Sequence, residues 1–161
     1  MSDDSPKPEI FVDADACPVR EETFRVATRL GLQVYLVANG SRPIRPPGLP
    51  NVSLVMVNDG MDAADDWIAE HITPFDICLT NDIPLASRCL NKGAAALAFT
   101  GKVWSDANIG NALAGREISR HLRELGAQMG SGKTFTKTDR SKFLSALDTA
   151  LMSLLRASGR S

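Results

Sequence analysis

Short apolar segments alternate with amphipathic helical segments through the first hundred residues of this chain. The apolar segments are mostly rich in β-branched residues and are bounded by turn-forming residues, which is typical of buried strands. Strands are predicted at Ile10–Val12, Val34–Ala38, Val52–Val57, Asp76–Thr80 and Ala94–Phe99. Strands that alternate with helices form a mostly parallel sheet covered on both faces. The sequence therefore predicts an α/β fold of three layers, α/β/α, around a central sheet of about five strands.

The helices are marked by apolar residues at helical spacing and by proline or glycine at their ends. They are predicted at Pro18–Leu30, at Asp62–Ile72, between Asp82 and Lys92, at Ile109–Leu125 and at Asp139–Ala157. We expect a single domain, residues 9–157, after a disordered acidic tail at residues 1–8. The leucine-rich face of the last helix fits either closure of the core or a homodimer contact.

Composition and cysteine usage indicate the cellular compartment in which we expect the protein. No apolar run approaches the roughly 18 to 20 residues that a membrane span needs, and the N-terminus lacks the pattern of a signal or transit peptide. Cys17, Cys78 and Cys89 form no CxxC pair, which argues against a disulfide framework or a structural zinc site. We therefore expect a cytoplasmic protein without a membrane partner.

Charge is distributed unevenly along the chain. Residues 1–100 carry a net charge of −6 and residues 101–161 a net charge of +5. This division suits an enzyme that holds cations in one place and polyanions in another. It is equally compatible with an uneven solvated surface.

Aspartates follow three of the predicted strands. Asp13 and Asp15 come directly after the first strand, and Asp82 follows the strand that ends at Thr80. A third group, Asp62, Asp65 and Asp66, shares one face of a predicted helix. Because the carboxyl ends of parallel strands meet at one edge of a sheet, and ligands bind there, we expect these groups to converge.

Converging carboxylates repel one another unless a cation is bound. Oxygen ligands completed by water suit Mg²⁺, with Mn²⁺ as a near equivalent. Only two histidines are present, His71 and His121, which argues against an imidazole-rich site. The predicted metal ligands are Asp13, Asp62, Asp65, Asp66 and Asp82, and the predicted catalytic residues are Asp13, Asp15 and Asp82.

Each of these aspartates also has an ordinary structural explanation. Asp62 and Asp65 suit the positive end of their helix. Asp82 suits an N-cap, and Asp13 or Asp15 could accept hydrogen bonds from turn amides. The recurrence of acids at three strand ends favours the metal site.

Two other motifs are weaker. Cys17 stands at a predicted helix N-terminus, which lowers a thiol pKa, but the neighbouring aspartates act in the opposite direction and Thr23 stands where a Cys-x₅-Arg phosphatase needs arginine. We therefore expect Cys17, like Cys78 and Cys89, to be a packing residue. Residues 127–134 match the loose phosphate-loop pattern, but they follow a predicted helix rather than a strand, which argues against an NTPase.

Basic residues of the C-terminal half are candidates for contacts with a nucleic acid. Lys133 and Lys137 lie in the connection before the last helix, and Arg140 and Lys142 lie at its start. They fit phosphate contacts or a solvated surface equally well, as do Arg42 and Arg45 in the proline-rich loop. Trp104 could stack on a base, although a buried position is favoured.

Five stretches resemble the YaiI/YqxD family of small, functionally uncharacterised bacterial proteins. They are Val12–Val19, Gly60–Trp67, Thr80–Ala86, Asn108–Gly110 and Phe135–Arg140, the last followed by Phe143. The resemblance runs from about residue 9 to residue 155. The sequence Gly-Ser-Gly-Lys-Thr at residues 130–134 departs from the Gly-Gly-Pro form associated with this family.

The resemblance implies membership in the PIN-like superfamily, in which a parallel sheet carries flanking helices and many members are metal-dependent ribonucleases. Asp13 would then be the first metal ligand and Asp82 the acid after the later strand. The mid-chain acid would be one of Asp62, Asp65 or Asp66.

We therefore expect a Mg²⁺- or Mn²⁺-dependent nuclease, with RNA as the favoured substrate over DNA. One alternative is a phosphatase of the haloacid-dehalogenase type, with Asp13 as nucleophile, Asp15 as general acid and residues 36–41 as a second motif. Another is a protein that binds the metal without catalysis.

Overall fold

The computed structural model describes residues 7–15, 17–40, 44–45, 47–58, 60, 62–111 and 135–157. Its centre is a sheet of five strands in the order β3-β2-β1-β4-β5, and every neighbouring pair is parallel. The strands are β1 (Ile10–Asp13), β2 (Val34–Asn39), β3 (Val52–Val57), β4 (Ile77–Leu79) and β5 (Ala95–Leu97). The predicted parallel sheet is confirmed.

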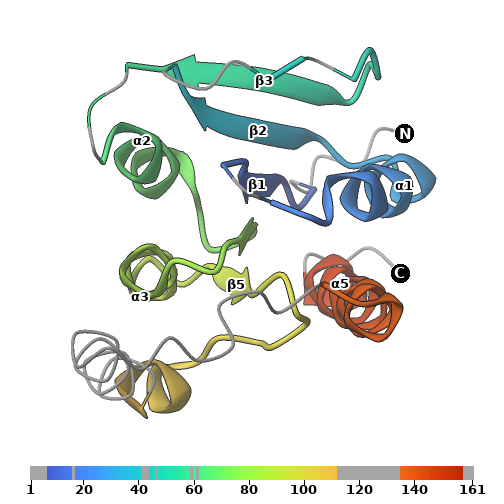
Figure 1. Cartoon of the computed structure of the whole chain (residues 1–161). Coiled ribbons are helices and arrows are strands. Elements are labelled where there is room, and N and C mark those ends of the chain that lie inside the picture. The colour runs from blue at the N-terminus through green and yellow to red at the C-terminus, as the bar shows by residue number, and fades with distance from the viewer. Residues whose placement is uncertain are drawn as a thin grey trace, which may run out of the picture.

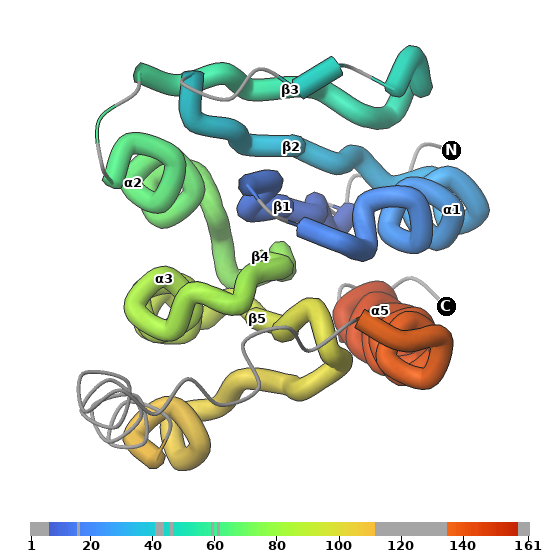
Figure 2. The backbone as a smooth tube through the Cα atoms, viewed as in Figure 1, coloured from blue at the N-terminus to red at the C-terminus, as the bar shows by residue number. Residues whose placement is uncertain are grey.

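Helices cover both faces of this sheet (Figure 1). The helices α1 (Arg20–Leu30) and α5 (Lys137–Ala157) pack on one face, and α2 (Ala63–His71) and α3 (Ile83–Asn91) pack on the other. In the tube view, α1 lies beside α5 and α2 lies beside α3 (Figure 2). The fold is therefore the predicted three-layer α/β/α arrangement.

The alternation of side chains along β1 decides which layer each residue meets. Ile10 and Val12 enter the core cluster formed with α1 and α5, whereas Phe11 enters the cluster formed with α2 and α3. All three are at most 1% exposed. Asp13 has the parity of Phe11 and pairs in register with Val37, a member of the α2/α3 cluster. The carboxylate of Asp13 is thereby delivered to the α2/α3 side of the sheet.

The final helix closes the opposite face. Phe143, Leu147 and Leu151 follow one another at intervals of four residues and are all fully buried against the sheet and α1. An ion pair between Arg29 of α1 and Asp148 joins the two helices. Of the two roles considered for this leucine-rich face, closure of the core is therefore the one that the structure bears out.

Local capping sets the helix boundaries. Helix α5 begins at Lys137, two residues before the predicted start, because Thr136 and Asp139 exchange side-chain and backbone hydrogen bonds in a capping box. Ser105 and Asn108 do the same before helical residues 106–111. The rest of the helix predicted at Ile109–Leu125 lies outside the described residues.

At the other end of the chain, residues 1–6 of the predicted tail also lie outside the described residues, and Pro8 is already buried. None of the described helices combines the length and apolarity needed to span a bilayer.

Candidate active site at the carboxyl edge of the sheet

Two of the acid groups meet where the strand order reverses. The chain moves outward from β1 to β3 and then returns to place β4 on the other side of β1. Such a reversal opens a crevice at the carboxyl edge of a parallel sheet. Asp13 ends β1 and Asp82 follows β4, so their adjacent strands bring these two carboxylates together there.

Thr80 connects the two acids. Its side chain is fully buried, and its hydroxyl donates a hydrogen bond of 2.8 Å to Oδ2 of Asp13. The same hydroxyl oxygen accepts a 2.9 Å hydrogen bond from the backbone N–H of Asp82. Behind it, the Thr80 carbonyl accepts a 3.1 Å hydrogen bond from Nε1 of Trp104, which is 7% exposed. The buried position predicted for Trp104 is confirmed, whereas no sequence pattern indicated its bond to Thr80.

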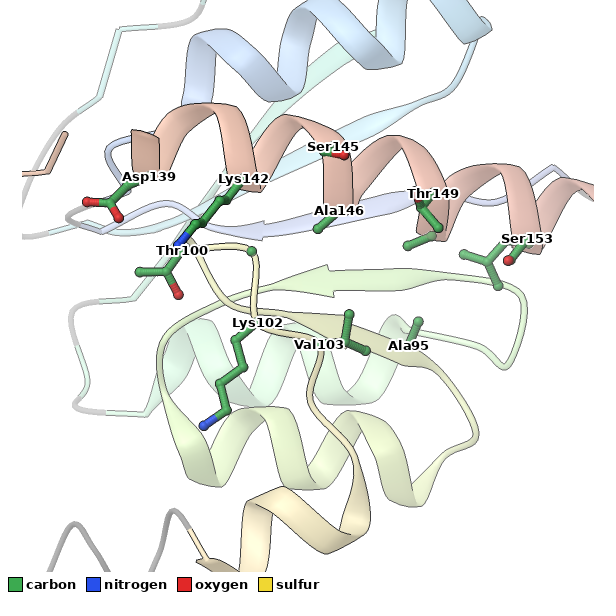
Figure 3. Close-up of a pocket in the computed structure, with 13 residues that line it drawn as sticks. Ala95, Thr100, Lys102, Val103, Asp139, Lys142, Ser145, Ala146, Thr149 and Ser153 are labelled. Carbon is green, nitrogen blue, oxygen red and sulfur yellow. The ribbon is translucent and has the colours of Figure 1, made fainter. Parts of the chain in front are cut away.

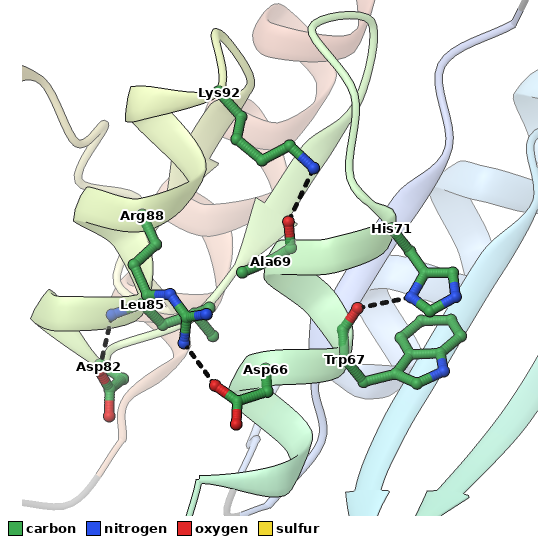
Figure 4. Close-up of polar contacts among 8 residues, drawn as sticks. All are labelled: Asp66, Trp67, Ala69, His71, Asp82, Leu85, Arg88 and Lys92. Atoms are coloured by element: carbon green, nitrogen blue, oxygen red, sulfur yellow. Dashed lines mark hydrogen bonds and ion pairs between the residues drawn. The ribbon is translucent and has the colours of Figure 1, made fainter.

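Asp82 is also the N-cap of α3. Its Oδ1 accepts a 2.9 Å hydrogen bond from the backbone N–H of Leu85 (Figure 4). The preceding residue, Asn81, accepts a 2.8 Å hydrogen bond from the backbone N–H of Phe99 through its Oδ1. The segment Thr-Asn-Asp therefore holds the turn after β4 with three side chains, and Asp82 combines its structural role with its place in the acidic cluster.

Asp65 brings the third acid from helix α2. Burial raises its pKa to about 7, with further increases from the charges of Asp82, Asp13 and Asp62, in that order. The pKa of Asp13 is raised to about 6, mainly by burial, with added effects of Asp82 and Asp15; the hydrogen bond from Thr80 acts against these increases. The charges of Asp13 and Asp82 act on Asp65, and the charge of Asp82 acts on Asp13, so these three carboxylates lie within electrostatic reach of one another.

The other two aspartates of α2 take different places. Asp66 forms a 2.8 Å ion pair with Arg88 of α3, and both side chains are about half exposed (Figure 4). Asp62 is exposed at the start of α2 but lies near enough to raise the pKa of Asp65. The sequence left open which of the three acids faces the cluster. Asp65 does, and it lies three and four residues before the buried Ile68 and Ala69, which was the available signal.

The loop after β1 holds Asp15 and Cys17. Oδ1 of Asp15 is buried and receives no hydrogen bond from the described residues. Cys17 is 4% exposed, and burial raises the pKa of its thiol to about 12. Cys17 is therefore a packing residue as predicted, and so are Cys78 and Cys89, which are fully buried.

The donor set of this cluster fits a hard, hydrated cation. All the donors are carboxylate oxygens, and the buried Oδ1 of Asp15 lacks a partner. Among the described residues no three acidic, histidine or cysteine side chains already surround a point that could hold a metal ion. Mg²⁺ is commonly held by one or two carboxylates with water in its remaining positions. A closed cage is therefore not required for this ion.

The predicted nucleic-acid contacts fall into three groups. Lys133 lies outside the described residues. Lys137 and Lys142 are exposed at the start of α5. Lys142 and Lys102 line a largely apolar groove of about 920 Å³ between α5 and the segment after β5, and Lys142 points toward Thr100 (Figure 3).

Arg140 makes internal contacts that no sequence pattern indicated. One guanidinium nitrogen donates a 2.7 Å hydrogen bond to the carbonyl of Pro18 and lies 3.2 Å from Oε2 of Glu22. Its partners stand about 120 residues earlier in the chain, so only the folded arrangement brings them together. Ser41, the last residue of the second phosphatase motif considered above, lies outside the described residues, as does His121.

Comparisons with known proteins place the chain in one family. A profile of the uncharacterized YaiI/YqxD family matches residues 11–153. The chain is 52% identical to a UPF0178 protein of Rhodospirillum rubrum over 92% of its own length and 98% of the relative. It is 51% identical to a UPF0178 protein of Parvibaculum lavamentivorans, over 92% and 96% of the two chains. No solved structure matches it. A match over nearly the whole domain, with half of the residues identical, shows that this chain belongs to the YaiI/YqxD family.

Proposed function

We propose that this protein is a Mg²⁺- or Mn²⁺-dependent phosphodiesterase that cleaves RNA. The observation that carries the proposal is the convergence of Asp13, Asp65 and Asp82, from three separate elements, at the edge of the sheet where ligands bind. The resemblance of the family to PIN-like ribonucleases favours RNA among the possible phosphodiesters.

Asp13 and Asp82 would hold the metal ion, with Asp15 beside them. A divalent ion held there would supply an activated water and stabilise the charge that develops on phosphate oxygens. Thr80 fixes the carboxylate of Asp13, and the bond to Leu85 fixes that of Asp82, so neither has to be ordered when the substrate arrives.

Asp65 is suited to proton transfer. A group acts best as a general base when its pKa lies near the working pH, and in the metal-free protein burial, with the charges of Asp82 and Asp13, raises the pKa of Asp65 to about 7. Its carboxylate would accept the proton that the attacking water loses.

Exposed lysines on the same edge support a polyanionic substrate. Helix α5 begins at the carboxyl edge, because Arg140 reaches the loop after β1 and the Lys142 carbonyl lies against Gly101 in the loop after β5. Lys102, Lys137 and Lys142 therefore lie on the side of the molecule that carries the acidic cluster, where they can bind phosphates without entering the cluster itself.

The proposal is tested with single-stranded RNA and DNA of one sequence, labelled at one end and incubated with the purified protein and Mn²⁺. We expect RNA cleavage, abolished by EDTA and lowered by on the order of a hundredfold or more in Asp13→Asn and Asp65→Asn. Asp148→Asn removes a carboxylate of α5 that lies outside the cluster, together with its surface ion pair to Arg29, and serves as the control for the loss of a charge, with unchanged activity.

Asp66→Asn should retain most of the activity, because Asp66 is paired with Arg88.

Two further experiments distinguish the nuclease from the other two functions considered. Calorimetric Mn²⁺ binding without cleavage of either nucleic acid would contradict the nuclease and favour a non-catalytic metal-binding protein. Hydrolysis of a phosphomonoester with a fluoride analogue trapped on Asp13 would favour the phosphatase.

A further inference from the structure

A pocket lies at the start of α1, where Cys17 and Pro18, which follow β1, form part of its lining. Its volume is about 710 Å³, and it is formed by the start of α1, by β2 and by residues that follow β2. This volume is within the range of pockets that bind small molecules. Sequence patterns did not indicate the pocket, because its walls come from three segments that only the fold brings together.

Two arginines give the pocket a positive side. Arg20 is the first residue of α1, and Arg45 comes from the segment after β2. Among the described residues, neither takes part in an ion pair. The positive end of the α1 dipole adds to their charge. A phosphate group placed here would meet two guanidinium groups that can bind it with directed hydrogen bonds.

The remaining walls suit more than a phosphate. Phe24 and Leu36 are buried and form an apolar wall with the partly buried Ile44. Glu21 lines the same pocket and can accept hydrogen bonds from hydroxyl or amino groups. An inorganic anion would use only the arginines, whereas a nucleoside phosphate would use the apolar wall and the carboxylate as well.

Cys17 shows that the pocket and the acidic cluster are neighbours. It lines the pocket, and burial is the main cause of its raised pKa. The charge of Arg20 lowers this pKa and the charge of Asp13 raises it, so both lie within electrostatic reach of one thiol. A chain of nucleotides with one phosphate at the acids can therefore extend toward the pocket.

We infer that this pocket is a nucleotide subsite, in which Arg20 and Arg45 hold a phosphate and the wall formed by Phe24 and Ile44 holds the attached nucleoside. Its role as a subsite of catalysis rests on the function proposed above, whereas its ligand chemistry does not. The nucleoside phosphate can be a unit of an RNA chain or a free nucleotide.

The test measures binding in EDTA, so that no cleavage is needed. Fluorescence anisotropy of a labelled oligouridylate gives the affinity of the wild type, of Arg20→Gln, of Arg45→Gln and of the double variant. We expect the double variant to bind on the order of tenfold more weakly, with its salt slope reduced by about one for each arginine. Arg25→Gln, on the exposed side of α1 and outside the pocket, is the matched control with unchanged binding.

Competition experiments distinguish the two sources of the ligand. Displacement of the oligouridylate by uridine 5′-monophosphate, but not by equal inorganic phosphate, supports a subsite that also takes free nucleotides. Arginine-dependent binding without displacement by the monophosphate supports a subsite that takes the unit only within a chain. Equal displacement by inorganic phosphate would contradict the proposal that the wall formed by Phe24 and Ile44 binds a nucleoside.

Unchanged affinity in the double variant, or an equal loss in Arg25→Gln, overturns the subsite. Combined with Asp13-dependent cleavage, that result refutes the subsite and leaves the proposed function intact. Arginine-dependent binding with no cleavage under any metal refutes the proposed function and leaves the subsite intact.

Discussion

The carboxylate of Asp13 depends on a residue that carries no charge. The Thr80 hydroxyl donates a hydrogen bond to Asp13 and accepts one from the backbone N–H of Asp82. The backbone carbonyl of Thr80 accepts a hydrogen bond from the indole of Trp104. The hydrogen bond to Asp13 partly offsets the rise in the Asp13 pKa that burial causes. The Thr80 hydroxyl, a neutral donor, therefore reduces the unfavourable free energy of placing several carboxylates at one edge. The part that remains raises the pKa values of Asp13 and Asp65, so both groups retain their protons to a higher pH.

Those retained protons make the stability of the metal-free protein depend on pH. The pKa values of Asp65 and Asp13 rise from 3.8 to about 7 and about 6, so between about pH 4 and pH 7 the folded state binds more protons than the unfolded state. We predict that the melting temperature in EDTA falls as the pH rises through this window, and falls less in Asp65→Asn.

The difference between wild type and Asp65→Asn isolates this residue from other titrating groups. Added Mg²⁺ should reverse the trend, because it binds deprotonated carboxylates and gains affinity as the pH rises. Equal slopes for the two proteins in scanning calorimetry would contradict the assignment of Asp65 to the cluster.

At the scale of elements, the first turns of α5 are joined to two loops of the carboxyl edge. Arg140 reaches the Pro18 carbonyl in the loop after β1, and Gly101 in the loop after β5 lies directly against the backbone of α5. Gly101 has φ of +94°, and a Cβ there would come within 2.8 Å of the Lys142 carbonyl oxygen. Both the turn and the close approach require glycine.

We predict opposite signs for two glycine substitutions. Gly101→Ala should lower the free energy of unfolding by at least about 1–2 kcal/mol from its backbone conformation, with the clash against α5 in addition. Gly110→Ala should be neutral or raise it by up to about 1 kcal/mol, because the residue is helical and no described atom lies within 4 Å of the added Cβ. Urea unfolding of both variants measures the difference, and equal effects would contradict the close packing at Gly101.

Strand and helix positions could be predicted because burial repeats along the chain. The alternation in β1 and the four-residue spacing of Phe143, Leu147 and Leu151 are local patterns that survive folding unchanged. The capping role of Asp82 was also visible, since an aspartate followed by Ile83 and Pro84 is a local signal.

The pairings between distant residues could not be predicted. Whether Asp66 meets Arg88, or Arg140 meets Glu22, depends on the rotation and separation of packed helices. The pattern of charges on each helix allowed the acids of α2 to be grouped but did not say which one turns inward. The packing of Ile68 decides which acid of α2 turns inward. Arg140, which the sequence suggested as a phosphate contact, instead links α5 to Pro18 and to Glu22 of α1.

For the whole molecule, acids gather at the centre of the carboxyl edge and exposed lysines stand beside them. Helix α5 has 21 residues and is therefore roughly 30 Å long, with Lys137 and Lys142 near the end that lies on this edge and Arg156 near the other end. Substitutions at the two ends of α5 can therefore show whether RNA binding depends on the position of a positive charge or only on the number of charges.

We predict that Lys137→Gln and Lys142→Gln together weaken the binding of the labelled oligoribonucleotide and reduce its salt slope by about one for each lysine. Arg156→Gln, which changes the net charge by the same amount as either single lysine variant, should leave the affinity unchanged. Anisotropy titrations at several salt concentrations measure this. A loss in Arg156→Gln equal to that in each lysine variant measured singly would mean that net charge alone attracts the RNA.

The strand at the middle of the sheet is also the first of the five described strands to be synthesised. β1 pairs with β2 and with β4, so its two hydrogen-bonded edges are completed only when residue 79 has been made. The apolar face that holds Ile10 and Val12 stays open on one side until α5 supplies Phe143, Leu147 and Leu151. A nascent chain that stops before α5 therefore leaves this face exposed to solvent, so the core is completed only when α5 has been made.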